Sequence, residues 1–465
     1  MIAQNVIAAN RFGLGARPGE LQAIGGDARG WLVRQIEGAR PTPAAVGGLA
    51  SSAEVFTIFT EGRQEKRSAR AAAADGEAAK RVIERIRTKL LPMYLEQVAA
   101  RYQVATRSEE PFREHLTHFW TNHFAVSADK PQVLALAGTL ENEVIRPRIA
   151  GNFTDMLLAV EAHPAMILYL DNQTSTGPDS QFAQYAARRM RNARKLDINE
   201  NLAREILELH TLGVDGGYTQ ADVTTFARAL TGWSIGSDGP FPEGVPGKFE
   251  FRERLHEPGT KSVLGRRYSQ EGVEQPRAIL RDLAAHPATA RHIATKLVRH
   301  FVADEPPASA VDRVAKAFRD SDGDLPTVHR ALLEVPQAWS AAATKFKTPH
   351  EFVVSAFRMF DFVPAQPQQV AAPFELLGQR PYAPGSPAGW PDRADQWDGP
   401  DALLKRIEWA NAVGERVGAR LQPLNLATQS LGETLSEHTR TAIARAASPA
   451  QGVTLLLASP EFQRR

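Results

Sequence analysis

Two histidines one helical turn apart make the segment PFREHLTHFWTNHFAVS, residues 111–127, the first place to look for chemistry. On a helix His115, His118 and Asn122 fall at positions i, i+3 and i+7, so they share one face, whereas His123 points elsewhere. Imidazole suits zinc, iron or copper, so two histidines at this spacing could hold a metal ion. The alternative is a core helix whose aromatic rings pack and whose imidazoles bond to the backbone.

A second polar pattern lies in NENLAREILELHTLG, where Asn199 is a good N-cap and Gly213 ends the predicted helix. One stripe is apolar except for one histidine: Leu202, Ala203, Ile206 and His210. The opposite stripe is polar: Asn201, Arg204, Glu205 and Glu208. This stripe is either a solvated face with an Arg204–Glu208 pair, or a wall of a cavity where two carboxylates bind a cation. In either case His210 is a buried imidazole that needs a partner.

Three further motifs carry polar groups. Asp171 and Asn172 end an apolar helix, where they cap the next element or project into a site, and capping is the favoured interpretation. Thr219 and Asp222 have the spacing of a capping box, and its helix leads to Arg228 and Trp233. His256 and Lys261 flank Glu257-Pro258-Gly259, where a turn explains the Pro-Gly but requires neither the imidazole nor the amine.

These patterns suggest an enzyme with a polar site between helices: a metal-assisted hydrolase, or a related hydrolytic or redox enzyme. The expected catalytic residues are Glu205, Glu208 and Arg204, and the expected ligands of a divalent metal are His123 and His210. The expected binding residues are Asn122, Asn199, Asn201, Asp171, Arg228, Trp233, His256 and Lys261. A helical wheel places His210 opposite Glu205 and Glu208, so one helix cannot offer all three groups to one ion.

Several function classes lack their signatures. The sequence contains no HExxH, no Walker A loop, no GxGxxG that opens a helix and no GxSxG. It contains no cysteine, which excludes disulfides, thiolate metal sites and a cysteine nucleophile. A formal net charge of +2 gives no electrostatic case for nucleic-acid binding.

The elements that must position these groups are mostly helices. Helical periodicity recurs in 111–125, 131–150, 152–170, 199–213, 219–232, 273–302, 307–335 and the C-terminal segments, so a large, mainly α globular domain is predicted. Alternating polar and apolar residues predict a small β-hairpin near 248–268. The expected divisions are an N-terminal helical region at 1–108, a motif-rich core at 109–360, a Pro/Gly-rich linker or loop at 361–398, and C-terminal helices at 399–465 that pack on the core.

No run of about 18 apolar residues predicts a transmembrane helix, and no secretory signal is visible. As written, the sequence predicts a soluble, cytoplasmic protein. A periplasmic or exported protein is the expectation if the true N-terminus is missing.

Long motifs then give the chain a family resemblance. Six motifs, in this order, resemble those of the bacterial family of domain of unknown function 1800. They are NRFGLGA, FWTNHFAVS, NENLAREILELHTLGVDGGYTQADV, HPATARHIATKLVRHFVADEPP, KFKTPHEFVVSAFR and GQRPYAPGSPAGWP. The resemblance implies a largely helical protein of unestablished activity. It also implies an alternative function, in which a non-catalytic binding or assembly protein acts with a partner of the domain of unknown function 1501 family.

Overall fold

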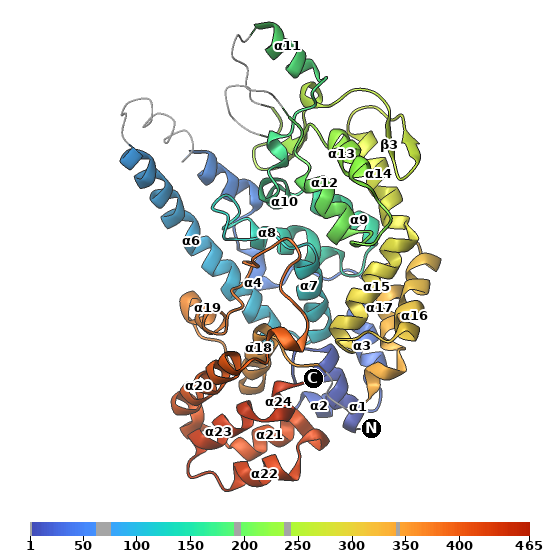
Figure 1. Cartoon of the computed structure of the whole chain (residues 1–465). Helices are drawn as coiled ribbons and strands as arrows, with labels where there is room; N and C mark the ends of the chain where they lie inside the picture. The colour runs from blue at the N-terminus through green and yellow to red at the C-terminus, as the bar shows by residue number, and fades with distance from the viewer. Residues whose placement is uncertain (1, 62–75, 190–196, 237–242, 341–344) are drawn as a thin grey trace.

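The protein is mainly α-helical. The computed structural model describes residues 2–61, 76–189, 197–236, 243–340 and 345–465, and Figure 1 shows helices in each of these segments. The described β-structure consists of two small antiparallel sheets, each with two strands. The predicted mainly α fold is therefore confirmed.

The first half of the described chain carries the helices that surround the predicted polar motifs. The α-helices are α1 (Ile2–Ile7), α2 (Glu20–Ala23), α3 (Ala28–Ile36), α4 (Ala44–Gly47), α6 (Gly76–Arg107), α7 (Pro111–His123), α8 (Ala137–Leu140), α9 (Phe153–Glu161), α10 (Pro164–Tyr169), α11 (Gln181–Arg189), α12 (Asn201–Glu205) and α13 (Gln220–Ala229). Short π or 3-10 turns follow several of them: η1 (Ala8–Phe12), η2 (Glu141–Ile145), η3 (Arg146–Arg148), η4 (Asn172–Thr174) and η5 (Ile206–His210).

The second half holds the remaining helices, and the last of them group at one end of the molecule in Figure 1. They are α14 (Glu274–Ala285), α15 (Pro287–Phe301), α16 (Ala308–Asp320), α17 (Leu325–Leu333), α18 (Pro349–Phe360), α19 (Pro367–Leu376), α20 (Pro400–Val417), α21 (Pro423–Leu431), α22 (Glu437–Ala444), α23 (Pro449–Ala458) and α24 (Pro460–Gln463). The short helices are η6 (Glu253–Leu255), η7 (Pro336–Trp339), η8 (Ala394–Gln396), η9 (Gly418–Arg420) and η10 (Gly432–Thr434).

Proline and capping residues decide where these helices begin. The periodic segment 273–302 is two helices rather than one, because Pro287 occupies the first turn of α15 and the His286 side chain accepts a hydrogen bond from the Ala288 N–H. The predicted capping box of Thr219 and Asp222 is confirmed at the start of α13. A second capping box, made by Thr348 and Glu351, starts α18.

The β-structure differs in detail from the predicted hairpin. Strand β2 (Phe249–Phe251) pairs with β1 (Trp233–Ile235), while β3 (Lys261–Val263) pairs with β4 (Arg266–Tyr268). The hairpin within 248–268 therefore turns at Leu264 and Gly265, not at Glu257-Pro258-Gly259. Both turn residues have positive φ, 50° and 74°, as a two-residue turn of the I′ type requires.

The Pro/Gly-rich segment 361–398 carries helix α19, and the chain after it lies against α7. The Asn122 side chain on α7 donates to the Trp390 carbonyl at 2.9 Å and accepts from the Trp390 N–H at 2.7 Å. Gly389 has a φ of +83°, and a Cβ there would lie 2.4 Å from the Asn122 carbonyl oxygen. This segment therefore covers one side of the residues described next.

One hydrophobic core connects the early and late parts of the chain. Phe12, Phe112 and Phe301 pack with ring centroids 5.7–6.0 Å apart, although they come from η1, α7 and α15. No helix in the described segments has the length and apolar character that a membrane crossing needs. The aromatic cluster forms the wall behind His115, whose ring centroid lies 4.8 Å from that of Phe301.

Candidate metal centre

A cavity of about 360 Å³ lies between α6, α7, α15, the start of α18 and the segment that follows α19. Five of the twelve histidines of the sequence line it: His115, His118, His123, His300 and His350. Two carboxylates, Glu351 and Asp392, also line it. Imidazole and carboxylate groups gathered in one sheltered space are the usual components of metal and acid–base sites.

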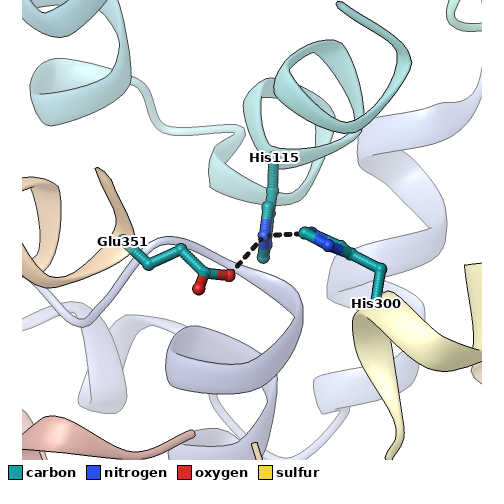
Figure 2. Close-up of side chains that lie close together, drawn as sticks. All are labelled: His115, His300 and Glu351. Atoms are coloured by element: carbon teal, nitrogen blue, oxygen red, sulfur yellow. Dashed lines mark hydrogen bonds and ion pairs between the residues drawn. The ribbon is translucent and has the colours of Figure 1, made fainter. Parts of the chain in front are cut away.

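Three of these side chains converge on one point. His115 comes from α7, His300 from the end of α15 and Glu351 from the first turn of α18, and Figure 2 shows them pointing toward one another. The His115 Nε2 lies 2.8 Å from the His300 Nε2 and 3.2 Å from the Glu351 Oε1. One potential ligand atom from each residue lies within 4.8 Å of the other two, and this is the group with such geometry in the described part of the chain.

The second nitrogen of each imidazole decides where its proton lies. The His115 Nδ1 is 2.9 Å from the Phe12 carbonyl, and the His300 Nδ1 is 2.9 Å from the Asp392 Oδ2. A carbonyl and a carboxylate only accept, so each Nδ1 carries a hydrogen. The two Nε2 atoms and a carboxylate oxygen therefore face one another, and a shared proton or a bound cation between them makes the arrangement favourable.

Burial and neighbouring charges keep His115 and Glu351 in the forms that bind metals. Burial lowers the pKa of His115 to about 4, so the ring is neutral at pH 7. Arg465 lies 2.6 Å from the Glu351 Oε1, and its charge holds the pKa of that buried carboxyl well below its ordinary value. A neutral imidazole and an ionised carboxylate are the ligand forms that a divalent ion requires.

The capping box of α18 aims the Glu351 side chain. Its Oε2 accepts from the Thr348 N–H at 2.8 Å, which leaves Oε1 to face the two imidazoles. In return, the Thr348 hydroxyl accepts from the Glu351 N–H at 3.3 Å. The same local structure that starts the helix thus fixes a candidate ligand.

The Thr348→Ala variant separates these two roles of the capping box. We expect it to lower the free energy of unfolding by about 1 kcal/mol, the usual cost of a lost N-cap. Metal affinity should be unchanged, because a backbone N–H, not the threonine hydroxyl, holds Glu351. Urea denaturation and metal titration measure the two effects, and Thr348→Ser is the matched control. A Thr348→Ala protein that keeps its stability but loses metal affinity would contradict this account.

A second histidine pair lines the same cavity one turn further along α7. The His118 Nδ1 lies 2.8 Å from the His350 Nε2, and the His350 Nδ1 lies 3.0 Å from the Tyr102 hydroxyl. The His118 Nε2 is buried and has no hydrogen-bond partner among the described residues. The chain Tyr102–His350–His118 can therefore pass a proton along three side chains toward the cavity.

The predicted ligands His123 and His210 lie near each other but outside the converging group. The His123 Nε2 is 3.2 Å from the backbone oxygen of His210, and the two ring centroids are 6.3 Å apart. The predicted buried imidazole in the apolar stripe has its partner, since the His210 Nδ1 is 2.8 Å from the Glu161 Oε1. The role of the pair in metal binding stays a prediction.

The polar stripe of the 199–213 segment lies apart from the cavity-lining residues. Arg204 pairs with Glu200 at 3.1 Å, and Tyr218 donates to Glu208 at 3.4 Å. Burial raises the pKa of Glu205, which is half-buried. Near the start of α12, the Asn199 side chain accepts from the Asn201 N–H at 2.9 Å, as an N-cap does. The structure does not bring these groups to His115, His300 and Glu351.

The other predicted binding residues make identifiable local contacts. Asp171 makes no side-chain cap to the following turn, and its carboxylate pairs with Lys130 at 2.7 Å instead. Arg228 pairs with Glu257 at 3.0 Å, and the Trp233 Nε1 donates to the Glu161 carbonyl at 2.6 Å.

Both side chains near Pro258 have structural partners, contrary to the sequence expectation. The Lys261 amine donates to the carbonyls of Glu257, Pro258 and Gly259 at 2.7–3.0 Å. The His256 Nδ1 lies 3.0 Å from the Thr231 carbonyl. Among the predicted binding residues, Asn122 lines the cavity.

His115 stands out in the sequence by its spacing from His118, but its two partners His300 and Glu351 do not. His300 lies in HPATARHIATKLVRHF and Glu351 in KFKTPHEF, so both belong to the motifs that carry the family resemblance. The Thr348-x-x-Glu351 spacing was the available local signal, and on its own it indicates only a helix start.

Comparison with known proteins gives a family and nothing further. A family model described as "Protein of unknown function (DUF1800)" matches residues 7–464, nearly the whole chain. No curated protein and no solved structure matches.

Proposed function

Because the chain belongs to the DUF1800 family, which is described as one of unknown function, we propose a function from the site itself: a divalent-metal-dependent hydrolase. His115, His300 and Glu351 are the proposed ligands of the ion. Two imidazoles and one carboxylate form the ligand set of catalytic zinc sites and of non-haem iron sites. The observation that carries the proposal is the convergence of three lone-pair-bearing atoms, with both Nδ1–H groups already bonded elsewhere.

The ligand atoms need only a small adjustment to hold an ion. Zinc lies about 2.0–2.1 Å from imidazole nitrogen, and at a tetrahedral angle this separates two nitrogens by about 3.3 Å. The His115 and His300 nitrogens are 2.8 Å apart, so they must separate by about 0.5 Å, which small side-chain rotations supply. Arg465 competes for the Glu351 Oε1, and its charge limits the affinity of the site for the ion.

Hydrolysis is the favoured reaction because acid–base groups line the same cavity. A metal-bound water attacks a substrate carbonyl or phosphoryl group once it has lost a proton. His118, with its unbonded Nε2, could take that proton transiently and pass one on to His350, while burial lowers the pKa of both rings and keeps them neutral at rest. A redox reaction at the same ligand set has no comparable supporting observation among the residues described.

The experiment is a metal titration of protein without a histidine tag. After removal of metal by a chelator, we expect one zinc, manganese or cobalt ion per chain in calorimetry and elemental analysis. Cobalt in place of zinc should give the visible absorption of a nitrogen- and oxygen-ligated site. Metal addition should also switch on hydrolysis of a small phosphate or carboxylate ester. Failure of every one of these ions to bind stoichiometrically would overturn the proposal.

The alternative, a non-catalytic protein that acts with a partner of the domain of unknown function 1501 family, has one observation in its favour. Leu403, Leu404 and Ile407 on α20 are 38–55% exposed and lie within one turn of the helix. Exposed apolar patches mark interaction surfaces only when they are large. A partner on α20 would also leave the converging lone pairs without a role, so the metal proposal accounts for more of the structure.

A further inference from the structure

Two cationic side chains in the cavity form no ion pair within the described part of the chain. Lys296 and Arg299 lie one turn apart on α15, both are half-buried, and both line the cavity with His300. Neither side chain forms a hydrogen bond or an ion pair with another described residue, and the Arg299 Nε is buried without a partner. Buried charged groups are normally paired, so the unpartnered Arg299 Nε requires an explanation.

Every other cation that lines the cavity in the described structure is paired. Arg101 lies 3.3 Å from Glu141, and Arg393 lies 2.6 Å from Glu305. Lys296 and Arg299 are therefore the two cavity-lining cations, among the described residues, that have no carboxylate partner.

The cavity carboxylates are also already satisfied. Glu351 is bonded to Arg465, and Asp392 accepts from His300 at 2.9 Å and lies 3.6 Å from Lys345. Neither acid is within ion-pair distance of Lys296 or Arg299. Burial lowers the pKa of Lys296 to about 8, the charge of Asp392 opposes this shift and that of Arg299 adds to it, and the amine stays mostly charged at pH 7.

We propose that Lys296 and Arg299 bind an oxyanion, a phosphate or carboxylate group, of the substrate. An arginine fork and a lysine ammonium are the side chains that recognise such groups, and the charge-assisted hydrogen bonds they form are the strong ones. His300 follows Arg299 directly in α15, so a bound oxyanion lies beside the metal ligand. The inference rests on the proposed function in one respect: it assigns the substrate class to the same cavity.

Inorganic phosphate and succinate are the probes, applied to the full chain after metal removal. We expect calorimetry to detect binding of at least one of them. The probe that binds more tightly identifies the substrate group as a phosphate or a carboxylate. Lys296→Gln and Arg299→Gln should each weaken that binding at least about tenfold, the range for one charge-assisted hydrogen bond. Binding of neither probe, or equal binding by wild type and both variants, overturns the inference.

A matched control and a stability readout distinguish binding from folding. Arg291 lies on the same helix, and its side chain is exposed and paired with Asp312. The Arg291→Gln variant should therefore not change the affinity for either probe. Loss of the unpaired charge of Lys296 should leave the melting temperature equal or higher, while the rise in melting temperature caused by the bound probe should disappear. A lower melting temperature with unchanged probe affinity would assign Lys296 a structural role and overturn the inference.

The metal experiment stays independent of this one. Probe binding is measured without metal, and metal binding without the probe. Lys296-dependent probe binding in a chain that takes up no metal supports the anion site and overturns the proposed hydrolase. Stoichiometric metal uptake without probe binding supports the metal site and overturns the anion site.

Discussion

Replacing His300 with alanine should abolish stoichiometric metal binding, because the variant loses one of three proposed protein ligands. Loss of a group that only orients a ligand costs about 10–100-fold in metal affinity. Loss of the ligand itself should cost more than about 100-fold, because the remaining His115 and Glu351 cannot enclose the ion. Calorimetric titration of the chelator-treated protein with zinc measures the change in dissociation constant.

Two further variants make this prediction specific. Asp392→Ala removes the carboxylate that accepts from the His300 Nδ1–H, and it should reduce the affinity about 10–100-fold without abolishing binding. His438→Ala removes an exposed histidine on α22 and should leave the affinity unchanged. A His300→Ala protein that binds zinc as tightly as the wild type would show that the ion is held elsewhere, and equal losses in all three variants would indicate unspecific binding.

The sequence predicted the helices, but the residues that converge in the cavity could not be read from it. Periodicity and capping residues act within one or two turns, so α7 and α13 could be placed from local pattern alone. The start of α18 shows the limit of such reasoning. The spacing of Thr348 and Glu351 predicts the start of a helix. Nothing in the local sequence indicates that the Glu351 Oε1 faces His115, 236 residues earlier in the chain.

The predicted site followed the density of polar groups within one segment, residues 199–213. Side chains on one helix diverge around its axis, so a compact ligand set normally needs groups from several elements. His115, His300 and Glu351 come from three helices, and their meeting depends on how α15 and α18 pack against α7. That packing is a tertiary property, and a single sequence without pairwise contact information does not contain a readable signal for it.

The polar residues that the sequence highlighted have a physical role even where they do not line the cavity. Lys261 donates hydrogen bonds to three backbone carbonyls of a loop, and His210 forms a buried hydrogen bond with Glu161. Unsatisfied buried carbonyls and carboxylates are costly, so a large helical core needs such partners. A polar residue in a family motif is therefore as readily a structural hydrogen-bond donor as a catalytic group.

Acid should unfold the metal-free protein at a pH well above that at which its carboxylates titrate. Burial lowers the pKa of His329 to about 3, and it lowers the pKa of His123 well below the ordinary value of 6.5. Trp120 donates its Nε1–H to the His329 Nε2 at 3.3 Å, and this hydrogen bond holds the ring in its neutral form. Both rings are almost completely buried, so a charge on either would go uncompensated.

The sign of the pH dependence follows from which state takes up the proton. The unfolded chain protonates these histidines below about pH 6.5, while the folded protein does not until near their lowered pKa values. Their stabilising contribution is therefore complete above pH 6.5 and is lost as the pH falls. His329 alone costs about 1.4 kcal/mol per pH unit in that window, or about 3 kcal/mol between pH 6.5 and 4.5, and His123 changes the stability in the same direction. A loss of that size is a large fraction of the stability of many domains.

Urea denaturation at pH 7.5, 6.0 and 5.0 measures this loss, and two substitutions identify its source. His329→Gln keeps an acceptor for the Trp120 N–H but cannot titrate, so the dependence of unfolding free energy on pH should become shallower by the contribution of one histidine. His438→Gln, at an exposed site, should leave that dependence unchanged. The free energy of unfolding should then fall steeply below pH 6.5 in the wild type and less steeply in His329→Gln. Equal stability at pH 7.5 and 5.0 in the wild type would mean that the buried rings are protonated without cost, and the same desolvation argument for a neutral, metal-binding His115 would fail with it.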